Sequence, residues 1–137
     1  MRLDSSAFVA DPDLVRALLP RSRPVACDSE RVLFTEDERA AGLYILQEGS
    51  ATLRMSSRDG ETIFSIEVLQ GSLLGVPALV GEHPYTSTAT AHAGARVRFV
   101  SRGDFAAIVP ADPLLSLKML ELLSAEVRSA RNALHRE

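Results

Sequence analysis

The stretch Gly42-Leu43-Tyr44-Ile45-Leu46, with the segment that follows it, decides the fold class of this chain. It is a short apolar run, and the next segment, Ala51-Thr52-Leu53-Arg54-Met55, alternates apolar and polar residues, as a strand with one buried face does. Asp59-Gly60 then marks a tight hairpin, because glycine accepts the positive φ that such turns require, and residues 62–66 return from it. These segments predict antiparallel β structure.

The same pattern extends in both directions from this hairpin. Residues 31–34, 85–92 and 95–100 are further short runs rich in β-branched residues, separated by Gly, Asp, Ser and Pro. Short strands at this spacing are typical of a sandwich or barrel rather than of a parallel sheet with crossover helices. We expect a mainly β fold, a jelly-roll-like double-stranded β-helix of about eight strands.

Both ends of the chain have helical patterns. Asp11 and Asp112 are N-cap candidates, and each precedes a proline at the first helical position, where the missing N–H costs nothing. We therefore predict one domain over residues 1–137. It contains an N-terminal helix over residues 8–20, a β-roll over 21–101 and C-terminal helices over 102–137.

The composition excludes several classes of protein. The chain has 137 residues, of which 46% are hydrophobic and 24% charged, and no apolar run reaches the ~18 residues of a membrane span. The single cysteine, Cys27, forms no disulfide within the chain, which fits a reducing, cytoplasmic location. The net charge of −3 argues against a general nucleic-acid binder.

The final helix has two apolar stripes, although docking on its own domain needs only one. Leu115, Met119 and Leu122 lie on one face. A neighbouring stripe has the alternating spacing of three and four residues seen in a coiled-coil seam, and it consists of Leu120, Leu123, Val127, Ala130 and Leu134. We predict that this second stripe is the interface of a homodimer, with a single wide core-facing stripe as the alternative.

The series of strands and glycines resembles the cyclic nucleotide-binding domain family. The residues that carry the resemblance are Gly42 to Gly49, then Asp59-Gly60, Gly71 and Leu74-Gly75, and it covers roughly residues 8–135. Among the members, the chain looks most like the sensor half of the catabolite-activator superfamily of transcription regulators. This resemblance implies a regulatory module and not an enzyme, so no residue is predicted to be catalytic.

In that family a phosphate-binding cassette holds the ligand, and here it corresponds to residues 75–87. The resemblance implies a ligand site formed by Leu74, Gly75, Val76, Pro77, Ala78, Tyr85, Thr86 and Ser87. Val76 stands where the family has a glutamate for the ribose hydroxyl, and Tyr85 stands where it has an arginine for the phosphate. Pro77 also lacks an N–H. A cyclic nucleotide is therefore a doubtful ligand, and we expect a degenerate cassette that binds cyclic AMP weakly or not at all.

Several alternatives remain open at this stage. One is a stand-alone protein-interaction β-roll with a vestigial pocket, and another is a cupin-like metalloenzyme. The latter needs clustered histidines, whereas the chain has only His83, His92 and His135, and we predict no metal site. A haem sensor would use Cys27, His83 or His92.

No recognisable motif in the sequence identifies the natural effector or the downstream partner of this module. The superfamily reads DNA with a helix-turn-helix that follows the dimerisation helix. The sequence has no such motif up to Glu137, so we expect no sequence-specific DNA binding by this chain alone and no membrane association.

Overall fold

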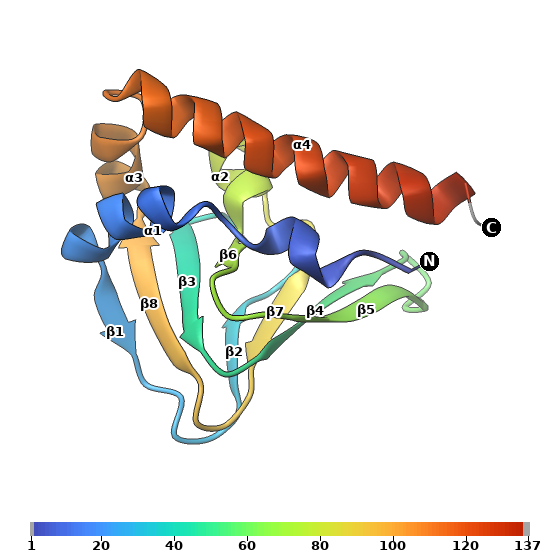
Figure 1. Ribbon diagram of the computed structural model, residues 1–137. Coiled ribbons are helices and arrows are strands. Elements are labelled where there is room, and N and C mark those ends of the chain that lie inside the picture. Colours follow the sequence, from blue (N-terminus) through green and yellow to red (C-terminus); the bar gives the residue numbers. More distant parts are fainter. Residues whose placement is uncertain (1, 136–137) are drawn as a thin grey trace.

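Eight antiparallel strands form two four-stranded sheets in the computed structural model, which describes residues 2–135 (Figure 1). The first sheet has the order β1 (Arg23–Val25), β8 (Arg96–Ser101), β3 (Gly42–Glu48) and β6 (Leu73–Leu74). The second has the order β2 (Arg31–Phe34), β7 (Thr88–Ala91), β4 (Ala51–Ser56) and β5 (Thr62–Val68). The predicted jelly-roll-like fold of about eight strands is confirmed.

Strand β3 is the central element of the first sheet, and both of its faces are buried. Leu43 and Ile45 pack in the hydrophobic cluster beneath the helices, whereas Leu46 belongs to the cluster inside the roll. A strand buried on both sides has no polar alternation, which explains the continuous apolar run over residues 42–46.

The β4–β5 hairpin forms where Asp59-Gly60 predicted it. Gly60 has a φ of 85°, and its N–H donates to the Ser57 carbonyl oxygen at 3.0 Å. The prediction for the following strand needs correction, because β7 begins at Thr88 and not at Tyr85. The preceding segment is a loop held to residues 37–38 by backbone hydrogen bonds of Tyr85 rather than by a strand partner.

The N-terminal helix predicted over residues 8–20 is shorter and interrupted. A 3-10 turn, η1, spans Ser5–Phe8, α1 spans Pro12–Leu18, and a second 3-10 turn, η2, spans Leu19–Arg21. Val9 pairs with Ser72 as an isolated β-bridge, which makes the backbone extended between η1 and α1. The side chain of Asp11 caps α1 by accepting from the Asp13 N–H at 2.8 Å, as predicted.

Three further helices complete the fold: one lies between β6 and β7, and two come after β8. They are α2 (Val76–Gly81), α3 (Arg102–Ile108) and α4 (Pro113–His135), and the predicted helix end at residue 137 lies outside the described residues. Figure 1 shows α4 lying across one end of the roll, above α2 and alongside the N-terminal segment. Within residues 2–135, no helix is both long and apolar enough to span a membrane.

Candidate functional site

A cavity of about 160 Å³ lies where the cassette meets the roll interior and α4. Seven of the eight predicted ligand-site residues line it: Leu74, Gly75, Pro77, Ala78, Tyr85, Thr86 and Ser87. The remaining lining comes from the N-terminal segment, the sheets and α4: Leu3, Phe8, Phe34, Leu53, Met55, Phe64, Leu73, Glu126 and Ala130. We call this space the cassette cavity.

Gly75 sets the shape of the cassette at the start of α2. Its φ is 91°, a left-handed conformation that side chains rarely adopt, and it occupies the N-cap position of the helix. A Cβ at this position would lie 2.8 Å from Cε1 of Tyr85. Both the backbone conformation and the contact with Tyr85 therefore require glycine here.

Val76 is the one predicted ligand-site residue that does not line the cassette cavity. It is fully buried in the cluster beneath the helices, together with Leu14, Leu18 and Leu79. Val76, which stands where the family has its ribose-binding glutamate, is therefore a core residue.

Tyr85 occupies the position equated with the phosphate-binding arginine, and it is 2% exposed. Its ring stacks on Phe34 with a centroid separation of 3.9 Å, and its hydroxyl donates to the Gly42 carbonyl oxygen at 2.6 Å. Burial raises the pKa of Tyr85 above its usual value, so the phenol is neutral at pH 7. Tyr85 therefore lines the cavity, and its hydroxyl already has a hydrogen-bond partner within the protein.

Thr86 and Ser87 complete the cassette with uncharged hydroxyl groups, exposed at Thr86 and half-buried at Ser87. Within residues 2–135, the lining of the cavity includes no lysine, arginine or histidine. A phosphate in this cavity would have no cationic partner, and a buried charge without one is costly.

The wall opposite the cassette is formed by α4 and contains a group that the sequence analysis missed. Oε2 of Glu126 is shielded from solvent and makes no hydrogen bond in the described part of the chain. Desolvation raises the pKa of Glu126 from 4.5 to about 7, and no opposite charge counteracts this effect. The helical register could have indicated this position from the sequence, because Glu126 follows Met119 and Leu122 on the same face of the helix.

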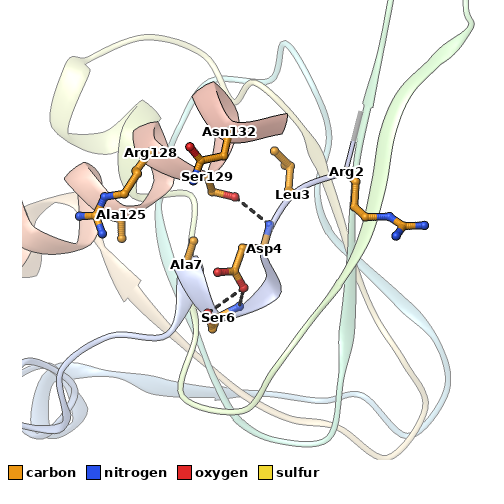
Figure 2. A pocket seen from close by; sticks show the side chains of 9 residues that line it. All are labelled: Arg2, Leu3, Asp4, Ser6, Ala7, Ala125, Arg128, Ser129 and Asn132. Atoms are coloured by element: carbon orange, nitrogen blue, oxygen red, sulfur yellow. Dashed lines mark hydrogen bonds between the residues drawn. The ribbon is translucent and has the colours of Figure 1, made fainter. Parts of the chain in front are cut away.

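The N-terminal segment covers the cavity on one side. Leu3 and Phe8 line it, and the Asp4 N–H donates to Oγ of Ser129 on α4 at 2.7 Å. Leu3 also lines a neighbouring hollow of about 450 Å³, whose other residues include Arg2, Arg128 and Asn132. Figure 2 shows the guanidinium groups of Arg2 and Arg128 pointing away from each other, so they do not converge on one anion.

The residues considered for haem or metal ligation lie elsewhere, and none of them lines the cassette cavity. Cys27 is buried, and its thiol contacts the Val25 carbonyl oxygen at 3.6 Å. His83 contacts the Pro84 carbonyl oxygen, and His92 contacts Glu67 at 2.7 Å. Within residues 2–135, no group of three or more His, Cys, Asp and Glu side chains is arranged to hold a metal ion.

The five residues of the predicted dimer interface share one side of α4, which we call the outer stripe. Leu120, Val127 and Leu134 are 61%, 53% and 59% exposed, and Leu123 and Ala130 are partly buried. Ala130 also lines the cassette cavity. Leu115, Met119 and Leu122 face the domain and are buried, and Leu123 packs against the same cluster, so the two predicted stripes are neighbours that meet at the partly buried residues of the outer stripe.

A comparison with known protein families finds a match over most of this chain. The sequence profile of the cyclic nucleotide-binding domain matches residues 24–112, which include seven of the eight strands and the whole cassette. A search of the curated proteins finds no match.

Solved structures share the fold at low sequence identity. The catabolite activator protein of Thermus thermophilus is 21% identical with a TM-score of 0.78, over 91% of this chain and 59% of that protein. The sensor domain of the transcriptional regulator DNR from Pseudomonas aeruginosa is 20% identical with a TM-score of 0.68, over 89% of this chain and 82% of that domain. A cyclic nucleotide-binding-like protein from Brucella abortus is 28% identical with a TM-score of 0.56, over 73% and 85%. The chain thus spans less than two thirds of the first of these proteins.

Proposed function

This chain belongs to the cyclic nucleotide-binding domain family, and we propose that it is the sensor module of a catabolite-activator type transcription regulator whose cassette binds cyclic AMP weakly or not at all. The family and the fold support a regulatory role, since the similar structures include a catabolite activator and the sensor domain of a regulator. The role is one of binding and not of catalysis. The net charge of −3 supports sensing and assembly rather than DNA contact by these residues.

The observation that carries the proposal is the lining of the cassette cavity. Its position between the cassette and α4 supports effector binding, because residues 74–87 and the dimer helix meet there. Its chemistry argues against a cyclic phosphodiester, because Tyr85 and Val76 replace the two recognising groups and Glu126 adds a carboxyl. Loss of a charge-assisted hydrogen bond costs about 1.5–3 kcal/mol, and loss of the second group adds to this.

We further propose that the module forms a homodimer through the outer stripe of α4. Three large apolar side chains on this stripe are more than half exposed, and they repeat every seven residues at 120, 127 and 134. A symmetric pair of such helices buries each stripe against its copy. In this arrangement Ala130 links the interface to the cavity, so a ligand there would contact the helix that mediates assembly.

Calorimetric titration of the purified protein with cyclic AMP and cyclic GMP tests the ligand part of the proposal. We expect dissociation constants weaker than about 100 μM, because a charged and a neutral hydrogen-bonding group are both removed from a micromolar site. Low-micromolar binding of either nucleotide would overturn it. Sedimentation equilibrium tests assembly separately, and a monomer at all concentrations would contradict the dimer.

A further inference from the structure

The cassette cavity combines three properties that together define a ligand class: its size, its aromatic lining and its charge. Its volume of about 160 Å³ is close to the ~150 Å³ of an engineered cavity that accepts benzene. A cyclic nucleotide has several times as many non-hydrogen atoms as benzene. The cavity as it stands therefore suits a small organic molecule with about the bulk of a benzene ring.

Aromatic side chains supply much of the wall. Phe8, Phe34, Phe64 and Tyr85 all line the cavity, and the stacked pair of Phe34 and Tyr85 forms one side of it. Aromatic faces attract cations through the ring quadrupole, and such rings form the binding sites of quaternary ammonium ligands in general. A purely apolar ligand could pack against the same rings, but it would gain no electrostatic attraction from their quadrupoles.

Glu126 adds the polar component. Among the residues that the structure describes, its buried Oε2 has no hydrogen-bond partner, and the lining of the cavity includes no cation. A buried carboxyl without a partner is costly, and a cation with an apolar body would supply the missing partner without displacing protein contacts. An anionic ligand would instead place two like charges in a poorly solvated space.

We propose that the cassette cavity binds a small organic ammonium ion, with its positive head paired with Glu126 and its apolar body against Phe8, Phe34 and Phe64. This inference rests on the proposed sensor function and specifies the effector of that site. It reverses the charge of the ligand that the family name implies. The pKa of about 7 for Glu126 means that binding of a cation releases a proton near neutral pH.

Three probes of nearly equal shape separate the effect of charge from that of size. Choline carries a trimethylammonium group, neohexanol is its neutral carbon isostere, and the anion of tert-butylacetic acid is the negatively charged counterpart. We expect choline to bind to the whole protein at pH 8 about tenfold or more tightly than neohexanol, and the anion to bind more weakly than both. Chemical-shift titration by NMR measures the affinities and shows whether the residues that shift are those that line the cavity.

The matched variants are Glu126→Gln and Glu121→Gln, since Glu121 lies on the exposed side of the same helix. Glu126→Gln should reduce the preference for choline over neohexanol to less than about threefold, whereas Glu121→Gln should retain it. A preference that survives in Glu126→Gln, or equal binding of all three probes to the wild type, overturns the proposal. So does the absence of choline binding up to about 10 mM.

The pH dependence of the wild-type protein tests the proposal without any variant. Among the described residues that line the cavity, Tyr85 is the only titratable group besides Glu126, and its pKa is raised from its already high usual value. Choline affinity should rise about tenfold between pH 6 and pH 8 as the carboxyl ionises, and neohexanol affinity should not. A pH-independent choline affinity contradicts the pairing. Tight cyclic AMP binding would instead overturn the proposed function, so the two failures are distinguishable.

Discussion

The two faces of α4 depart from the usual distribution of polar and apolar residues in opposite directions. The inner face packs on the domain through Leu115, Met119 and Leu122, yet it also buries a carboxyl oxygen of Glu126 without a partner. The outer stripe faces solvent, yet its side chains are apolar. Leu120, Val127 and Leu134 are each more than half exposed. Glu126 and Val127 are adjacent in sequence, so the departures occur at the same level of the helix.

This contrast bears on the two interactions that we propose for α4, assembly and ligand binding. Single exposed apolar residues are common on protein surfaces, but a row of them on one helix is typical of an interaction surface. A buried carboxyl without a hydrogen bond is uncommon and costs stability. We interpret the outer stripe as the surface that binds a second copy of the chain and the inner carboxyl as the group that binds a ligand.

The largest expected effect is on assembly. Val127→Glu places two like charges at the centre of a symmetric interface, which costs several kcal/mol. We expect the dimer dissociation constant to rise roughly a thousandfold, as measured by sedimentation equilibrium. Asn132→Glu adds the same charge on another exposed side of α4 and should leave the dimer intact. Equal weakening by both variants would show that net charge, and not the stripe, controls assembly.

Two adjacent residues of α4, one on each face, should differ in their contribution to folding stability. Met119 is 4% exposed and Leu120 is 61% exposed. In a monomeric Val127→Glu background, Met119→Ala should lower the free energy of unfolding by about 3.5 kcal/mol, and Leu120→Ala by less than about 0.5 kcal/mol. Denaturant unfolding measures both. Similar losses for the two variants would mean that Leu120 also packs on the domain.

Glu126 provides a third test, through pH. The unfolded chain releases this proton near pH 4.5, whereas the folded protein holds it to about pH 7. Between these values the folded state binds more protons, so the group lowers stability progressively as the pH rises from about 4.5 to 7. We expect Glu126→Gln to match the wild type near pH 4 and to exceed its free energy of unfolding by up to about 3 kcal/mol at pH 8. Denaturant unfolding across this pH range measures the difference.

The control for this test is Glu121→Gln, which removes an exposed carboxyl from the same helix. Its free energy of unfolding should follow the wild type across the whole pH range, within about 0.5 kcal/mol. A parallel pH profile for Glu126→Gln and the wild type would show that the carboxyl of Glu126 is hydrated in solution.

Most of the fold follows from patterns that are local in the sequence. The alternation over residues 51–55, the turn at Asp59-Gly60 and the proline-marked helix starts identify four elements: the strands β4 and β5 and the first residues of α1 and α4. Strands β1 and β6 were missed because they have three and two residues, too few for any periodicity. They are strands only because β8 and β3 lie beside them.

The site was less accessible to prediction from the sequence. The resemblance placed the cassette residues together, and seven of them line one cavity. It gave no indication that Val76 points into the core, which depends on how α2 packs against α1 and α3. The role of Glu126 depends on which distant segments, among them Leu3 and Phe8, come together around it, and no local pattern reports whether a carboxyl finds a partner there.

The smallest expected effect has the opposite sign to that of Glu126 and concerns the other wall of the same cavity. Tyr85→Phe removes a hydroxyl that donates to the Gly42 carbonyl oxygen at 2.6 Å, so a buried acceptor loses its partner. We expect a loss of about 1.5 kcal/mol in the free energy of unfolding, measured by denaturant at pH 8.

Tyr44→Phe is the control, because its ring also lies beside Phe34 but its hydroxyl makes no hydrogen bond in the described part of the chain, and it should cost less than about 0.5 kcal/mol. If Tyr85→Phe leaves the free energy of unfolding unchanged, the hydrogen bond from Tyr85 to Gly42 does not stabilise the fold, and the Tyr85 hydroxyl is available to bind a ligand. If it destabilises while Glu126→Gln stabilises, the cassette side of the cavity is satisfied by the fold and the α4 side is not, which identifies Glu126 as the group that a ligand would engage.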